Sequence, residues 1–287
     1  MDLRALLGRL EQSGQLLTVD EPLMADRQVA DRLLAHAERP TRFSQVAGSA
    51  FAVVGGLCSR REWMALGLGL VPDELTSAMA RALAHPSELP RWESGPCQEV
   101  VQEQARLDRL PILTHFADDP GPYVTAGVLV FRDPELGQQN LSFHRLLRLD
   151  ARRFAARLVE GRGAHTAWCR TYGDPRVAIC LGAPMQVLLA AAMSPPRGVD
   201  ELTLAQALAD TPVVRALGAD LWVPAYSEIV LEGRLTHQVA DEGPFVDLTG
   251  TRDFVRRQPV IEIDALTHRR DAFFQALVPG GLEHRLL

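Results

Sequence analysis

The feature that most limits how this chain can fold is a change of residue pattern at about Leu113. Before it, apolar residues recur at helical spacing, as with Val29 and Leu33 on one stripe. After it, short apolar runs alternate with Gly, Pro and Asp, which is typical of strands joined by turns. These runs are YVTAGVLVF, QNLSFHRLL, RVAICLG, SEIVLEG and PVIEIDAL. The pattern predicts an α/β (α+β) fold, with an N-terminal α/β domain over residues 1–113 and a sheet-rich domain over residues 114–287.

Helices are expected in both parts of the chain. In the first part, helical patterns cover residues 2–12, 26–38, 59–70 and 72–85, and AFAVVGG reads as a buried strand. In the second part, helices are predicted at residues 150–159, 184–193 and 200–209. The loop from His85 to Pro96 is rich in Pro, Ser and Gly, so it is the expected crossing between the two parts.

Composition narrows the chemistry that is open to the chain. All 30 basic residues are arginine, because the sequence contains no lysine. This excludes Schiff-base chemistry, lysine-anchored pyridoxal phosphate and a Walker-type phosphate loop. Any catalytic cation must therefore be arginine, a metal or a cofactor. A net charge of -6 without a basic tract predicts no nucleic-acid partner.

The cysteine pattern and the lengths of the apolar runs indicate the cellular compartment of the protein. The cysteines are scattered without a CxxC pair, which suits a reducing compartment and gives no zinc signature. The longest apolar run, QVLLAAAM, is too short to span a bilayer, and the N-terminus lacks a signal-peptide core. We therefore expect a cytoplasmic protein without a membrane partner.

Two acids flank a Gly-Pro pair near the end of the chain. In QVADEGPFVDLTG, Glu242 and Asp247 lie on either side of Gly243 and Pro244. Five extended residues span about 17 Å, so both acids can serve one site only if the chain turns between them. Gly-Pro permits such a turn. From these residues alone, the acids fit either a solvated hairpin turn or a shared site.

Strand parity singles out one arginine. In NLSFHRLL, Arg145 falls on the same face of the expected strand as Leu141 and Phe143. Arginine is rarely buried unless it is paired. Either Arg145 ends the strand and extends to solvent, or it meets Glu242, Asp247 or an anionic substrate.

Four motifs in order resemble the UbiD-type decarboxylases, a family that uses prenylated FMN. They are DPGPYVTAGVLVFRDPELGQQNLSFHR, WVPAYSEIVLEG, DEGPFVDLTG and ALTHRRDAFF. The region FSQVAGSAFAVVGGLCSRREWMALGLG also resembles the N-terminal half of the family, so the likeness covers nearly the whole chain. The resemblance implies a split β-barrel-like, flavin-binding domain over residues 114–287.

The resemblance also implies a cofactor site along one strand. By this likeness Asn140 and Glu201 would bind a divalent metal, Mn²⁺ or Mg²⁺, that holds the flavin phosphate, with K⁺ as a further candidate ion. Taken alone, Glu201 is better explained as an acid at a helix start, where the helix dipole favours it. The implied cofactor-binding residues are Asn140, Leu141, Ser142, Phe143, His144, Arg145 and Glu201.

The catalytic residues that the likeness implies are Arg145, Glu242 and Asp247. Arg145 would orient a substrate carboxylate, Glu242 would hold Arg145, and Asp247 would protonate the product after CO₂ has left. The substrate would be an aromatic or α,β-unsaturated carboxylic acid, in a decarboxylation that can be reversible. A flavin prenyltransferase would supply the cofactor.

Two departures from the family pattern bear on the function. The family's third metal ligand is a histidine in the helix after the arginine, where Glu160 or Gly161 stands here and His165 follows later. Family members also continue into a C-terminal domain, so we expect half of a split enzyme, a short member or part of a longer protein. Such a chain should expose an apolar face and form a homo-oligomer or bind a partner subunit. The alternatives to a decarboxylase are a flavin-binding accessory subunit and a non-catalytic homologue.

Overall fold

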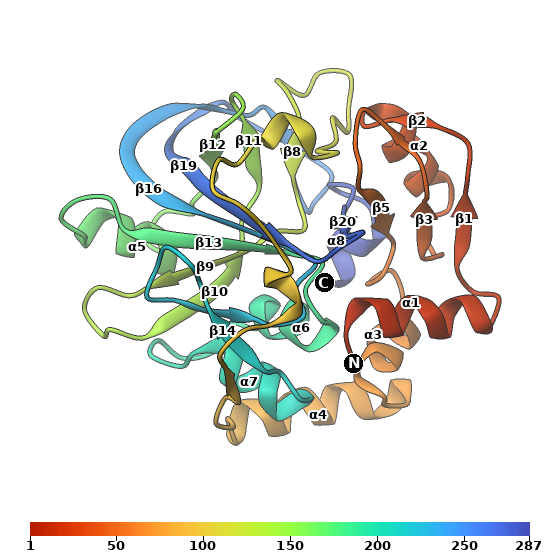
Figure 1. Cartoon of the computed structure of the whole chain (residues 1–287), viewed down its shortest axis with the longest axis horizontal. Coiled ribbons are helices and arrows are strands. Elements are labelled where there is room, and N and C mark those ends of the chain that lie inside the picture. Colours follow the sequence, from red (N-terminus) through yellow and green to blue (C-terminus); the bar gives the residue numbers. More distant parts are fainter.

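The computed structural model describes residues 1–287 and is built around a curled, antiparallel sheet of nine strands. This sheet forms the open half-barrel at the left of Figure 1. Its strand order is β10-β9-β13-β16-β19-β12-β11-β8, and β7 also pairs with β19. The predicted mixed fold with a split-barrel sheet is confirmed. The strands are β7 (Val100–Gln102), β8 (Tyr123–Val124), β9 (Val128–Arg132), β10 (Gln139–Phe143), β11 (Leu146–Arg148), β12 (Arg153–Ala156), β13 (Arg176–Leu181), β16 (Ile229–Glu242) and β19 (Arg256–His268).

The long hairpin of β16 and β19 gives the sheet much of its curl. The pairing of the two strands shifts register twice, once at Gly233. Such bulges bend a strand and increase its twist. A Cβ atom on Gly233 would lie 2.0 Å from the carbonyl oxygen of Glu262, so only glycine allows the strands to approach this closely. The bent strand β16 ends at Glu242, and its path sets the position of that acid.

Both faces of the sheet are buried. Along β9, Val128 and Val130 point into one core of 34 residues, whereas Leu129 and Phe131 point into a second core of the same size. This alternation follows from the two-residue period of a strand. It explains why the predicted strand runs are almost continuously apolar.

Helices cover the lower part of the molecule in Figure 1. Helix α6 packs against β10 and against the helices α3 and α7, and α7 packs against both β10 and α4. Residues 185–191 of α6 are all buried, which explains its apolar sequence on every side. The helices are α1 (Leu3–Gln12), α2 (Arg27–Ala35), α3 (Arg61–Leu68), α4 (Leu75–Ala84), α5 (Gly163–Arg170), α6 (Met185–Ala192), α7 (Glu201–Leu208) and α8 (Leu282–Leu286), with short 3₁₀ turns at Pro72–Glu74, Pro96–Gln98 and Leu107–Arg109. None of these helices has the length and apolar character that crossing a membrane would require.

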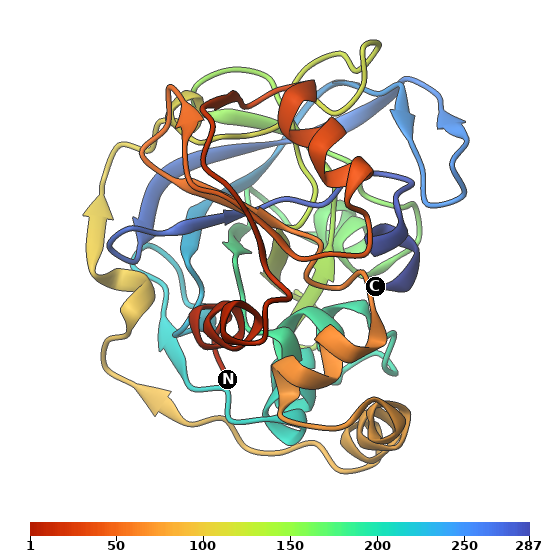
Figure 2. The same ribbon diagram turned by 90° about the vertical axis from the view of Figure 1, so that its right-hand side faces the viewer.

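Smaller sheets join the two ends of the chain. In the four-stranded sheet β1-β3-β5-β20, the late strand β20 pairs in parallel with β5. Figure 2 shows the red and orange N-terminal segment lying across this side of the molecule, with the dark blue end of the chain beside it. The remaining sheets are β15-β14-β6, β17-β18 and β2-β4. Their strands, with those of the four-stranded sheet, are β1 (Leu17–Val19), β2 (Leu23–Met24), β3 (Thr41–Phe43), β4 (Val46–Ala47), β5 (Ala52–Gly55), β6 (Arg91–Trp92), β14 (Val213–Arg215), β15 (Trp222–Pro224), β17 (Phe245–Val246), β18 (Arg252–Asp253) and β20 (Phe273–Gln275).

Hydrogen bonding therefore crosses residue 113 in both directions. Strands β6 and β7 pair with β14 and β19 of the later part, and β20 completes the sheet of the earlier part. The division into residues 1–113 and 114–287 remains a prediction about separate domains.

Most expected elements are present, but the helix predicted at residues 150–159 is wrong. The segment contains the strand β12, which is bonded to β11 on one side and β19 on the other. Its Ala and Arg residues favour a helix locally. The hydrogen bonds and packing that the segment gains between β11 and β19 outweigh that preference. Helix α5 was not predicted.

Candidate active site

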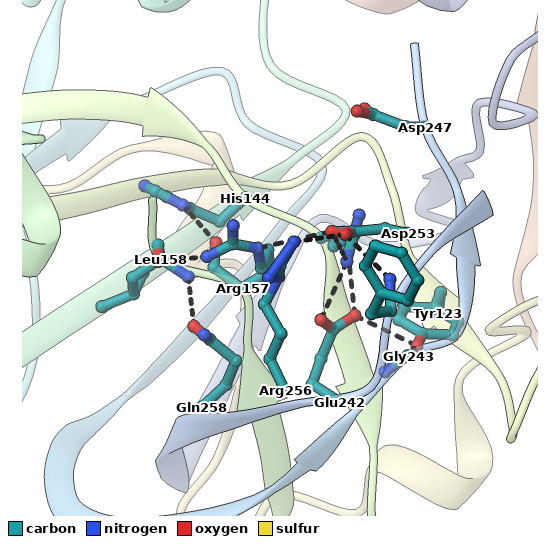
Figure 3. Close-up of polar contacts among 12 residues, drawn as sticks. Tyr123, His144, Arg157, Leu158, Glu242, Gly243, Asp247, Asp253, Arg256 and Gln258 are labelled. Carbon is teal, nitrogen blue, oxygen red and sulfur yellow. Dashed lines mark hydrogen bonds and ion pairs between the residues drawn. The ribbon is translucent and has the colours of Figure 1, made fainter. Parts of the chain in front are cut away.

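A buried ion pair lies where the curled sheet meets the β17–β18 hairpin. Arg145 follows the end of β10, and its Nε and Nη2 atoms donate to Oε1 and Oε2 of Glu242 at 2.8 and 2.9 Å. Figure 3 shows the Glu242 carboxylate facing this cluster. The Glu242 side chain is fully buried, and the Arg145 side chain is 11% exposed. Two parallel hydrogen bonds of this kind fix both the distance and the plane of the guanidinium.

A break in the predicted strand gives Arg145 its position. The expected run from Asn140 to Leu147 is two strands, β10 and β11, and Arg145 lies in the link between them. The link frees the arginine from strand parity, so its side chain reaches Glu242 while Leu146 and Leu147 remain buried. Of the two alternatives left open by the sequence, the structure therefore favours a paired Arg145.

Charge and burial act in opposite directions on Arg145. Burial alone would lower its pKa, but the hydrogen bonds and charges of Glu242 and Asp253 outweigh burial and raise the pKa above its ordinary value. Arg145 is thus a permanent cation. Because both partners are withdrawn from water, removing either one would leave a buried charge uncompensated.

Aromatic side chains enclose the pair. The Tyr123 hydroxyl donates to Glu242 Oε1 at 3.1 Å and accepts from the Gly243 amide at 3.2 Å. Burial raises the pKa of Tyr123 well above its ordinary value, so the phenol keeps its proton. The Phe245 ring lies 4.5 Å from Arg145 Cζ and 4.5 Å from the Tyr123 ring. Glu242 is therefore held by three hydrogen bonds and is fixed in place.

Asp247 stands apart from this pair. It lies in the turn between β17 and β18, it is exposed, and its Oδ1 accepts from the Leu248 amide at 2.6 Å. No hydrogen bond or ion pair joins it to Arg145, and Figure 3 shows it away from the cluster. The chain does turn between the two acids, as expected, but it brings only Glu242 to Arg145. The role of Asp247 as proton donor remains a prediction.

Asp253 is the acid that sequence reasoning missed. Its Oδ2 accepts from Arg145 Nη2 at 2.9 Å, and its Oδ1 accepts from Arg256 Nη2 at 2.7 Å. In the β17–β18 hairpin, Asp253 pairs with Phe245 across the two strands. Because Phe245 packs against Arg145, this pairing brings Asp253 back to the arginine. The sequence DLTG, at residues 247–250, is typical of a turn and could have indicated the hairpin that carries Asp253.

Asn140 and Glu201 come together, as the resemblance implied. Asn140 Nδ2 donates to Glu201 Oε1 at 2.6 Å, and the Leu141 amide donates to Glu201 Oε2 at 2.7 Å. Glu201 opens α7, where Asp200 is the N-cap, and its side chain is almost fully buried. Burial raises the pKa of Glu201 to about 7. No arginine pairs with this carboxylate.

These two side chains fit a divalent cation in part. Amide and carboxylate oxygens are ligands that Mg²⁺ and Mn²⁺ prefer, and a cation would favour the ionised form of a buried acid. The Asn140 oxygen lies 3.2 Å from the point where a Cβ of Gly163 would stand, at the start of α5. No cluster of three or more His, Cys, Asp or Glu residues suited to a metal occurs in the chain. Asn140 and Glu201 alone would leave positions around such a cation open to other ligands, such as a phosphate or water.

The residues at or near the third-ligand position of the family pattern make contacts of their own in and before helix α5. Its first residue, Gly163, has no side chain to offer next to Asn140. His165 Nδ1 accepts from the Gly161 amide at 3.4 Å and lies 3.7 Å from Cys169 Sγ. Glu160 pairs with Arg157 at 3.3 Å.

The other residues of the predicted cofactor strand divide between the core and a polar face. Leu141 is buried, and Phe143 packs against the same core. His144 Nδ1 lies 2.9 Å from the Arg157 carbonyl oxygen, which can only accept, so Nδ1 carries the proton. His144 Nε2 then accepts from the Ser142 hydroxyl at 2.9 Å. Burial lowers the pKa of His144 to about 4, so the ring is neutral.

Comparison with known proteins identifies two family regions. The N-terminal domain of 3-octaprenyl-4-hydroxybenzoate carboxy-lyase (UbiD) matches residues 7–83, and the Rift-related domain of the same carboxy-lyase matches residues 90–282. Anhydromevalonate phosphate decarboxylase of Methanothermobacter thermautotrophicus is 36% identical over 285 residues, which cover 97% of this chain and 66% of that protein. The chain thus spans about two thirds of the length of this curated relative.

Solved structures give the same result for the fold. The UbiD-class enzyme HmfF of Pelotomaculum thermopropionicum, in an evolved dimeric form with prFMN, matches with a TM-score of 0.94 and 31% identity, over 99% of this chain and 69% of that one. Vanillic acid decarboxylase (ShVdcCD) of Sedimentibacter hydroxybenzoicus in its closed form matches with a TM-score of 0.92 and 26% identity, over 99% and 65%. Motifs, fold and relatives agree: the chain belongs to the UbiD carboxy-lyase family.

Proposed function

We propose that this chain binds prenylated FMN and decarboxylates an α,β-unsaturated carboxylic acid at Arg145. The observation that carries the proposal is the buried Arg145–Glu242 pair at the end of β10, the strand to which the family likeness assigns the cofactor. The curated relatives are decarboxylases, and one solved relative contains prFMN.

Asn140 and Glu201 would hold the cofactor phosphate through Mn²⁺ or Mg²⁺. Their oxygen atoms suit such an ion. The ion would also place a positive charge beside the buried Glu201 carboxylate, with which no arginine pairs. The flavin, when bound, supplies the electron sink for loss of CO₂. The polar face of Ser142 and His144 would lie along the cofactor, with His144 neutral and fixed by Ser142 and Arg157.

Arg145 would bind the substrate carboxylate. Glu242 and Asp253 engage its Nε and Nη2 atoms, whereas Nη1 makes no hydrogen bond to the protein and is not fully enclosed. Nη1 can therefore donate to a substrate carboxylate without breaking the pair. Asp247, free of any ion pair, would move toward the site and deliver a proton to the carbon that CO₂ has left.

The substrate class follows from the relatives and remains part of the proposal. Of the two predicted classes, we favour the α,β-unsaturated acids over the aromatic acids. Proteins at 35 to 36% identity are anhydromevalonate phosphate decarboxylases, whereas vanillic acid decarboxylase is 26% identical.

A second candidate function is a flavin-binding subunit whose catalysis needs another chain. The exposed position of Asp247, away from Arg145, favours it. In that case a second copy of this chain or a partner subunit would complete the site.

Release of CO₂ from anhydromevalonate phosphate and from vanillic acid tests the proposal. Protein produced with a flavin prenyltransferase should release CO₂ from the first and not the second. Asp247→Asn should abolish release while flavin stays bound, because the amide cannot deliver a proton. The matched control is Asp241→Asn, which removes an equally exposed acid from β16. Full activity of Asp247→Asn would contradict its role, and no release from either acid, with flavin bound, would favour the subunit function.

A further inference from the structure

Arg145 has two carboxylate partners, and the second is not one that the motif provides. Glu242 binds Nε and Nη2, and Asp253 binds Nη2 from the opposite strand of the β17–β18 hairpin. Asp247, five residues beyond Glu242, makes no contact with the guanidinium. The hairpin thus brings Asp253 into the place that the sequence pattern assigned to Asp247.

Asp253 is held there by more than one arginine. Its Oδ1 accepts from Arg256 at 2.7 Å, and its Oδ2 lies 3.7 Å from Arg157 Nε. The backbone also holds the Asp253 carboxylate, because its Oδ1 accepts from the Phe254 amide at 2.9 Å. With a side chain only 15% exposed, Asp253 is an ordered part of this cluster.

These contacts keep Asp253 ionised. Partial burial acts to raise its pKa, but the hydrogen bond from Arg145, the Phe254 amide and the nearby charges lower the pKa below its ordinary value. An acid that remains ionised at neutral pH is a poor proton donor. Asp253, paired with Arg145 and Arg256, is therefore a fixed counter-charge to these arginines.

We propose that Asp253 is a positioning residue, which with Glu242 fixes Nε and Nη2 of Arg145 and leaves Nη1 for the substrate carboxylate. This inference rests on the proposed function for the role of Arg145. In this arrangement Glu242 and Asp253 together neutralise and orient Arg145. The third acid, Asp247, is left outside the ion pair.

The substitution Asp253→Asn tests the inference directly. The amide keeps the size of the side chain but removes one of the two carboxylates that hold Nη2, so the Arg145 guanidinium should be held less tightly, by Glu242 alone. The first measurement is hydrogen exchange of the Arg145 Nε–H by NMR, with its signal assigned by loss in Arg145→Gln. We expect exchange to become about tenfold faster or more in Asp253→Asn.

Catalysis gives a second, separate readout. In Asp253→Asn, kcat should fall by about tenfold while KM does not rise, because orientation counts in the transition state and a more positive site still binds an anion. The pH profile of kcat should keep its shape, since Asp253 is not the proton donor. Loss of one limb of that profile would mean that Asp253 carries the transferred proton and would overturn the inference.

The control is Asp241→Asn. Asp241 pairs with Arg257 at 3.3 Å, and both side chains are more than 60% exposed, so neither readout should change. Thermal unfolding of each variant establishes that it is folded. If Arg145 exchange and kcat in Asp253→Asn equal those of the control, Asp253 does not position Arg145. If wild type releases no CO₂ but exchange still accelerates in Asp253→Asn, the proposed function fails while the positioning contact stands.

Discussion

Glu242 is firmly held at the candidate site. It is fully buried, accepts two hydrogen bonds from Arg145 and one from Tyr123, and has the Gly243 amide bonded to the same tyrosine. A carboxylate held in this way suits orientation of a cation rather than proton delivery. At the scale of single residues, the Arg145–Glu242 pair is thus fixed, and in the proposed reaction the substrate and Asp247 would have to approach it.

This arrangement makes the pair important for stability as well as function. Arg145→Ala should destabilise the fold by about 3–5 kcal/mol, because it leaves the Glu242 charge buried without a partner. Glu242→Gln should cost less, since the amide oxygen still accepts one hydrogen bond from Arg145. Urea unfolding measures both changes.

The matched control for the arginine is Arg257→Ala. Arg257 forms an exposed pair with Asp241, so its removal should leave the unfolding midpoint unchanged. A loss of stability no larger in Arg145→Ala than in Arg257→Ala would show that the buried pair is not a structural element.

Helix α8 is tied to the N-terminal part by one buried acid. Glu283 accepts from the Gly56 amide at 2.8 Å and from the Cys58 amide at 2.8 Å, in the loop between β5 and α3. Burial raises the pKa of Glu283 to about 7, although the backbone hydrogen bonds partly offset burial. Just before α8, Gly280 lies against Val246, next to the turn that carries Asp247.

The raised pKa predicts how stability changes with pH. A glutamate in the unfolded chain loses its proton near pH 4.3, whereas Glu283 in the folded protein keeps it to about pH 7. The folded state thus binds the proton more tightly, so the contribution of Glu283 is greatest below about pH 4.3 and is lost as the pH rises to about 7. Relative to Glu283→Gln, wild type should lose about 4 kcal/mol of stability across that window.

Urea unfolding at several pH values measures this difference. Glu88→Gln, at an exposed position, is the control and should show no such trend relative to wild type. Parallel pH curves for wild type and Glu283→Gln would mean that Glu283 does not titrate in this range.

Sequence reasoning succeeded where a contact followed from local pattern. A cation among apolar residues needs an anion, so a pair between Arg145 and Glu242 was among the alternatives, although Arg145 lies in a link between two strands and not on the expected strand face. It failed where a contact depended on pairing across strands. Asp253 reaches Arg145 only because β17 and β18 pair, and β12 is a strand only because β11 and β19 leave room for it. The turn sequence DLTG allows the hairpin of β17 and β18, but it does not say which side chains the hairpin brings to Arg145.

At the scale of the whole molecule, the two ends of the chain form one structure. Arg4 of α1 binds the buried Glu228 at the start of β16 at 2.9 Å, and Arg269 binds the same acid at 3.2 Å. Together with the pairing of β5 and β20, these contacts fix the N-terminal segment against the curled sheet. The candidate cofactor strand β10 therefore lies on a framework that both family regions build.

The measurement that tests the central claim most directly is the flavin and metal content of purified protein. Protein produced together with a flavin prenyltransferase should retain modified flavin and a divalent metal, detected by absorbance and mass spectrometry. The double variant Asn140→Ala with Glu201→Ala should lose both while its circular dichroism is unchanged, and Asp241→Asn should retain both. Wild-type protein that is colourless and free of metal under these conditions, or a double variant that keeps its flavin, would contradict a cofactor site at Asn140 and Glu201 beside the Arg145–Glu242 pair.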